Sequence, residues 1–71
     1  MKIYTLVEID GNYVSQAKSF LQEFAAKIEY ILKVNEYFET NFEDYETAKD
    51  FFDYRQSDYG LQIICTEVKN G

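Results

Sequence analysis

The spacing of the hydrophobic residues changes period near the start of the chain, and this change restricts the fold more than any other feature. Residues 2–9 (KIYTLVEI) alternate and are rich in branched and aromatic side chains, which predicts a strand. Between residues 13 and about 34 the apolar residues recur at steps of three and four, which predicts an amphipathic helix. Asp10, Gly11 and Asn12 lie between these segments and predict a turn, with Asn12 as the N-cap of the helix.

The helical spacing also predicts which side chains of this first helix face the core. The predicted inner stripe consists of six residues: Val14, Ala17, Leu21, Phe24, Ile28 and Ile31. The opposite, solvent-facing side is predicted to carry Lys18, Gln22, Glu29 and Lys33. Tyr30 is expected to point outward, and Asn35 to end the helix in the left-handed conformation.

The remaining sequence predicts a second helix, a last strand and one ambiguous segment between the two helices. Residues 36–42 (EYFETNF) alternate and favour a short strand, with continuation of the first helix to Phe38 as the alternative. The second helix is expected to start at Asn41 or Asp44 and to run to about residue 56. Residues 61–68 (LQIICTEV) are apolar on both sides, which predicts a strand in the centre of the sheet.

These elements together predict a small two-layer α+β domain. Their order is β-α-(β)-α-β, with two helices on one face of a two- or three-stranded sheet. No linker or repeat divides the chain, so residues 1–71 are expected to form a single domain. The other sheet face is expected to lack a cover, and the predicted uncovered apolar residues are Tyr4, Leu6, Ile64 and Val68.

Composition excludes several classes of protein. The chain has no His and a single Cys, so we expect no disulfide framework, no metal and no cofactor. Cys65 is expected to be a buried, unreactive thiol. The apolar stretches are too short to span a bilayer and no leader pattern precedes them, which predicts a cytoplasmic protein. A net charge of −6 argues against direct contact with nucleic acid or an anionic membrane.

The negative charge is concentrated in one acidic aromatic segment, residues 36–58. This segment has eight acidic and two basic residues, so it accounts for the whole net charge of −6. Eight of the thirteen aromatic residues lie between residues 37 and 59. On the predicted second helix, the steps of three and four place four acids on one face: Glu43, Glu46, Asp50 and Asp53.

The candidate binding residues come from this segment and its margin. They are expected to contact a partner protein and are Glu36, Glu39, Glu43, Glu46, Asp50, Asp53, Tyr54, Asp58 and Tyr59. A row of carboxylates beside exposed aromatic rings can occupy a basic groove that otherwise holds phosphates and stacked bases. The simpler interpretation is that the row is the solvated face of a surface helix. No catalytic residue is assigned, since no cleft signature accompanies the carboxylates, and the chain is not expected to be an enzyme.

In size, charge and acidic row, the chain resembles the small acidic proteins by which phages inhibit bacterial defence, such as anti-CRISPR proteins and DNA mimics. This resemblance is one of class, because these proteins share no common motif and no residue role can be transferred. It implies an inhibitor that binds a basic nucleic-acid-binding protein or ribonucleoprotein, such as a CRISPR-Cas effector, and blocks its groove. The alternative is a non-catalytic assembly module that forms a homodimer through the uncovered sheet face.

Overall fold

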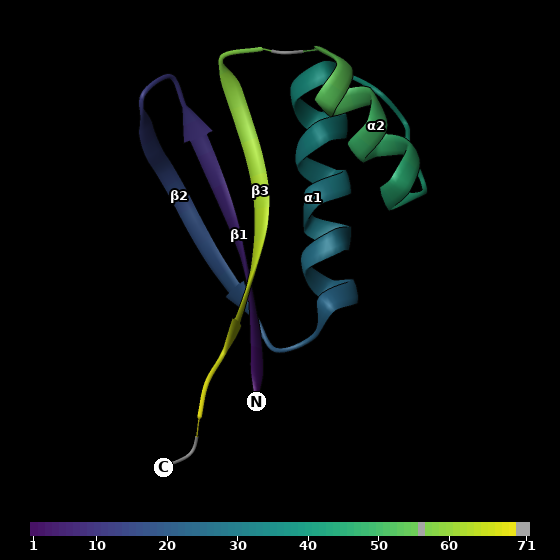
Figure 1. The fold of residues 1–71 in the computed structure, drawn as a ribbon. Coiled ribbons are helices and arrows are strands. Elements are labelled where there is room, and N and C mark those ends of the chain that lie inside the picture. The colour runs from purple at the N-terminus through teal and green to yellow at the C-terminus, as the bar shows by residue number, and fades with distance from the viewer. Residues whose placement is uncertain (56, 70–71) are drawn as a thin grey trace.

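The computed structural model describes residues 1–55 and 57–69. The elements follow in the order β1 (Lys2–Asp10), β2 (Tyr13–Phe20), α1 (Glu23–Phe38), α2 (Tyr45–Arg55) and β3 (Tyr59–Glu67). The strands form an antiparallel sheet in the order β2-β1-β3, and both helices lie on one of its sides (Figure 1). The predicted α+β class is therefore confirmed. Within the described part of the chain, neither helix has the length and apolar character needed to cross a membrane.

One strand of the sheet comes from residues 13–20, which were predicted to begin the first helix. They form β2, which pairs with β1 across a tight turn. Gly11 has a φ of 69°, a left-handed conformation that glycine adopts without a Cβ penalty and that favours such hairpins. Asn12 lies in this turn and is not a helix cap. The Gly11 N–H also donates to the Asp58 carbonyl at 3.1 Å, which ties the hairpin to the start of β3.

The helix α1 extends to Phe38, so the strand favoured for residues 36–42 is wrong and its alternative is correct. Glu39, with a φ of 56°, takes the left-handed position that ends the helix, in place of Asn35. Asn35 lies inside the helix, and its side chain instead binds the chain that follows. Its Oδ1 accepts hydrogen bonds from Thr40 Oγ1 and the Phe42 N–H, both at 2.8 Å, and its Nδ2 donates to the Phe42 carbonyl at 2.9 Å.

The core lies between the sheet and the two helices and is centred on Tyr30. This side chain is 2% exposed, so its predicted outward position is wrong. Its ring makes edge contacts with Tyr45 at 5.1 Å and Phe52 at 5.9 Å, which join α1 to α2. The buried residues packed around it are Leu6, Val34, Ala48, Tyr59 and Leu61. The inner stripe of α1 is therefore Ala26, Tyr30 and Val34.

This orientation of α1 leaves an apolar surface in solvent. Four large side chains, which we call the α1 stripe, are at least half exposed: Leu21, which lies just before the helix, and Phe24, Ile28 and Leu32 within it. Three of them were predicted to face the core. The reverse side of α1 instead points Glu29 and Lys33 at the sheet, where Lys33 Nζ lies 3.5 Å from Glu8 Oε2.

β1 is the central strand, because it pairs with β2 on one side and β3 on the other. The last strand is therefore at an edge of the sheet, contrary to prediction. Leu6 is 3% exposed and faces the helices, together with its neighbour in alternation, Tyr4. Ile64 pairs with Thr5 on the opposite face and is 43% exposed. An uncovered face is thus present, but Tyr4 and Leu6 do not belong to it.

The end of β3 differs from the prediction in one further respect. Cys65 is exposed, because it lies in the half of this edge strand that extends beyond the helices. Val68 follows the strand, is half-buried, and donates its N–H to the Met1 carbonyl at 2.7 Å. The first and last described segments of the chain therefore lie side by side.

Candidate partner-binding surface

The helix α2 positions the central part of the predicted binding surface. It begins after Asp44, whose Oδ2 accepts hydrogen bonds from the Thr47 N–H at 3.0 Å and from Thr47 Oγ1 at 2.9 Å. These bonds cap the helix and lower the pKa of the Asp44 carboxyl. Of the two predicted starts, Asn41 and Asp44, the structure confirms Asp44: it caps the helix, whose first residue is Tyr45. Gln56, near the predicted end, lies outside the described residues.

The rotation of α2 about its axis is fixed by the aromatic side chains on its inner side. Phe52 contacts Tyr30, and Phe51 lies 5.4 Å from the Phe38 ring, measured between ring centroids. Arg55 covers the outer surface of this cluster, with its guanidinium 4.7 Å from the Phe51 ring. With this side packed, the opposite side of α2 faces solvent.

Three of the four predicted acids, Glu46, Asp50 and Asp53, lie on this solvent side together with Tyr54. All four residues are exposed, and Tyr54 is 88% exposed. We call this set the acidic α2 face. Lys49 Nζ lies 2.6 Å from Asp53 Oδ2, and the Asp53 carboxylate raises the pKa of the Lys49 ammonium. Within residues 1–55 and 57–69, no ion pair involves Glu46 or Asp50, so their charges are directed at solvent.

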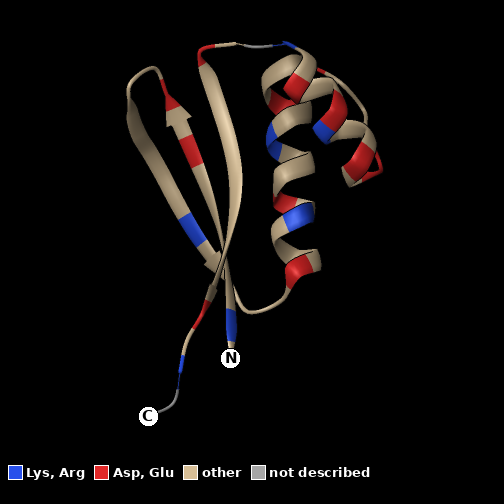
Figure 2. Ribbon diagram, viewed as in Figure 1, with Lys and Arg blue, Asp and Glu red and all other residues tan. Residues whose placement is uncertain are grey.

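The other predicted acids are exposed but lie outside α2. Glu43 is in the connection before the helix, so the predicted row of four is a row of three. Glu36 and Glu39 lie at the end of α1, and Asp58 immediately precedes β3. Figure 2 shows acidic positions on α2, near the end of α1 and at the start of β3. The structure thus brings most of the predicted acids to the helical side and one end of the molecule.

Tyr59 does not belong to this surface, although the sequence placed it there. It is 8% exposed, and its ring stacks on Tyr37 at 4.2 Å between centroids and 8° between planes. Its hydroxyl donates to Glu8 Oε1 at 2.6 Å. Burial, and then the hydrogen bond to the Glu8 carboxylate, raise the pKa of this phenol. Tyr59 is therefore a core residue, and Tyr37, 54% exposed, is the aromatic residue that solvent reaches.

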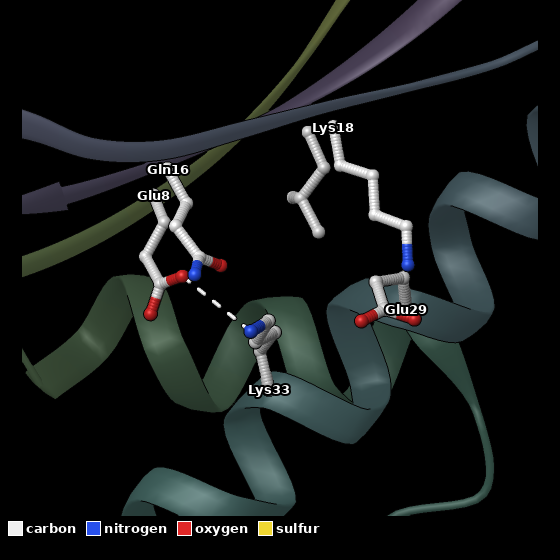
Figure 3. A pocket seen from close by; sticks show the side chains of 6 residues that line it. Glu8, Gln16, Lys18, Glu29 and Lys33 are labelled. Atoms are coloured by element: carbon white, nitrogen blue, oxygen red, sulfur yellow. Dashed lines mark ion pairs between the residues drawn. The ribbon is translucent and has the colours of Figure 1, made fainter.

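The sequence prediction missed a polar crevice between α1 and the sheet. It has a volume of about 90 Å³, and Figure 3 shows the charged side chains that line it. Glu8 and Lys33 form the ion pair drawn there, while Lys18 points toward Glu29. The opposite charges face one another, so the crevice links helix and sheet. The one sequence signal for it was Glu8, a charged residue between the apolar residues Val7 and Ile9.

In the part of the chain that the structure describes, no three His, Cys, Asp or Glu residues are grouped as a metal site requires. No protein-family model, curated protein or solved structure matches this chain. Function must therefore be inferred from the surfaces described above.

Proposed function

We propose that this protein is a non-catalytic inhibitor that binds a basic nucleic-acid-binding protein or ribonucleoprotein, such as a CRISPR-Cas effector. In this proposal it acts in the cytoplasm of a bacterial host cell and occupies the groove that would otherwise hold nucleic acid. The supporting observation is the acidic α2 face, where Glu46, Asp50 and Asp53 lie beside the exposed ring of Tyr54.

The spacing of these groups suits a groove that binds a polyanion. Glu46 and Asp53 are seven residues apart, which corresponds to about 10 Å along the helix axis. The carboxylates can meet Lys and Arg side chains that otherwise contact phosphates, and Tyr54 offers a flat ring where a base would stack. Because these charges are exposed, such binding is expected to weaken as salt screens them.

The competing explanation is that these acids only hydrate the outer side of α2. The ion pair between Lys49 and Asp53 fits that explanation, since it reduces the charge of the row. The distribution of charge favours binding, because the segment 36–58 has the full net charge of −6 while the rest of the chain is neutral. A solubility role alone does not require this concentration.

Two double variants separate these explanations. E46Q/D50N removes two charges from the acidic α2 face, and E23Q/E67Q removes two charges from exposed positions outside it. Both variants change the net charge by the same amount. Each is tagged and used to capture proteins from a nuclease-treated bacterial lysate across a salt series. We expect the wild type and E23Q/E67Q to capture the same basic protein, and E46Q/D50N to bind it about tenfold more weakly, since each exposed charge contact contributes up to ~1 kcal/mol.

Equal capture by both double variants would show that the α2 carboxylates make no contact with the partner. Capture that does not decrease with salt would also contradict the proposal, because exposed charges are screened. Circular dichroism of each variant checks that the fold is retained.

A further inference from the structure

We propose that two copies of this chain associate through the sheet face that the helices leave uncovered. This proposal does not depend on the proposed function. The open sheet face consists of the strand residues that alternate with Leu6 along β1, and their partners on β2 and β3. Its apolar residues are Ile3, Val7, Ile9, Val14, Ala17 and Ile64. Both helices lie on the other side of the sheet (Figure 1).

Charged residues are absent from the open sheet face. The register of the three described strands places all of their charged side chains on the helix side: Lys2, Glu8, Asp10, Lys18 and Glu67. In an antiparallel sheet with one solvated face, the charged residues ordinarily lie on that face. Here the distribution is reversed, in a chain of which 28% is charged. The other side chains of this face are polar but uncharged (Thr5, Ser19, Gln62 and Thr66), so the uncovered face is free of charge.

The charge of the molecule argues for a second copy as the occupant. Two chains with a net charge of −6 repel one another wherever acidic surfaces meet. On the open sheet face they can approach without opposing like charges. Because both copies use the same face, the contact is self-complementary and closes as a pair. Two such faces can pack as a sandwich with the sheets about 10 Å apart.

The size of the face sets the expected strength of this contact. The nine residues of β1 span ~30 Å, and three strands are ~14 Å wide, which gives a flat footprint of about 400 Å² per copy. This is about half of the ~800 Å² per partner in a standard stable interface. We therefore expect a weak, reversible dimer. In it, both acidic α2 faces stay exposed, because α2 lies on the helix side of the sheet.

The α1 stripe is the other apolar surface that could join two copies. Glu36, which is exposed, follows Leu32 by one helical turn. A contact over this stripe would therefore have an exposed acid at its margin, whereas the open sheet face contains no charged residue. The stripe is therefore a poorer self-contact than the open sheet face.

A matched pair of substitutions tests the proposal. Ile64→Lys places a charge on the open sheet face, and Ile28→Lys places the same charge on the α1 stripe; the two isoleucines are 43% and 50% exposed. In sedimentation velocity over a concentration series, the wild-type mass should increase from 8.4 kDa toward twice that value. Ile28→Lys should behave like the wild type, whereas Ile64→Lys should associate at least tenfold more weakly. Should Ile64→Lys fail to fold, Ala17→Lys adds a charge to the same face without removing a large side chain.

A wild type that stays at 8.4 kDa at every concentration would overturn the proposal. So would loss of association in Ile28→Lys with association retained in Ile64→Lys, which would identify the α1 stripe as the interface. The pair should persist at high salt, because its contact is uncharged. Partner capture through α2 is expected to decrease with salt, so the failure of one proposal is distinguishable from failure of the other.

Discussion

Replacing Tyr30 with alanine is expected to leave the protein largely unfolded at room temperature. Tyr30 is 2% exposed and contacts both Tyr45 and Phe52 on α2. Truncation of a large buried aromatic ring to alanine costs about 3–5 kcal/mol. A single core in a chain below ~70–80 residues rarely supplies more than about 3–5 kcal/mol of stability. The loss is therefore comparable with the whole stability of the domain.

Urea unfolding followed by circular dichroism measures this effect, and two variants serve as controls. Tyr30→Phe retains the ring and should unfold at nearly the wild-type midpoint. Tyr54→Ala removes the same atoms from a side chain that is 88% exposed and should also change the midpoint little. If Tyr30→Ala and Tyr54→Ala had equal midpoints, the orientation of α1 described here would be wrong.

Replacing Asn35 with alanine should produce the second largest loss, because this side chain makes three hydrogen bonds to the connection between the helices. Each such bond contributes ~1 kcal/mol, and the site is only partly buried, so we expect a total loss of about 2 kcal/mol. The loss should be accompanied by faster amide hydrogen exchange in α2, because the bonds to Thr40 and Phe42 hold the segment that leads into it.

Two controls separate this effect from a general loss of helix stability. Thr40→Val removes one of the three bonds and should cost correspondingly less. Asn12→Ala makes the same chemical change in the exposed β1–β2 turn and should leave exchange in α2 unchanged. Exchange in α2 that is the same in Asn35→Ala and in the wild type would show that these bonds do not position the helix.

The fold class was predicted correctly from the sequence, but the position of one strand was not. Val14 and Ala17 fit the helical spacing of the residues that follow them, so the apolar period appears continuous across β2 and into α1. The signal that contradicts it is local: Asp10-Gly11 after an alternating strand is a strong hairpin sequence. The strand β2 could have been predicted if this turn had been weighed above the longer period.

The orientation of α1 was not predictable from apolar spacing alone. The usual rule places the apolar side of a helix inward, but this helix has apolar residues on two sides. The side with Ala26, Tyr30 and Val34 is buried, whereas Phe24 and Ile28 are exposed. Contacts with residues distant in the sequence decide between these two sides, and such contacts leave no signal in the local pattern.

The acids were correctly predicted to be exposed, because a charged residue without a partner is seldom buried. The aromatic residues were not, since the same ring can be buried or exposed. Tyr54 and Tyr59 illustrate this difference: one is 88% exposed and the other 8%. The contact that buries the Tyr59 hydroxyl comes from Glu8, at the other end of the chain, and no local pattern predicts it.

The central claim, that the acidic α2 face occupies a nucleic-acid-binding groove, is tested most directly by competition. The captured protein is loaded with a fluorescently labelled duplex DNA, and fluorescence anisotropy is followed as this protein is added. We predict that the wild type and E23Q/E67Q release the DNA at similar concentrations and that E46Q/D50N requires about tenfold more. Simultaneous binding of DNA and inhibitor, with anisotropy that does not decrease, would contradict the claim.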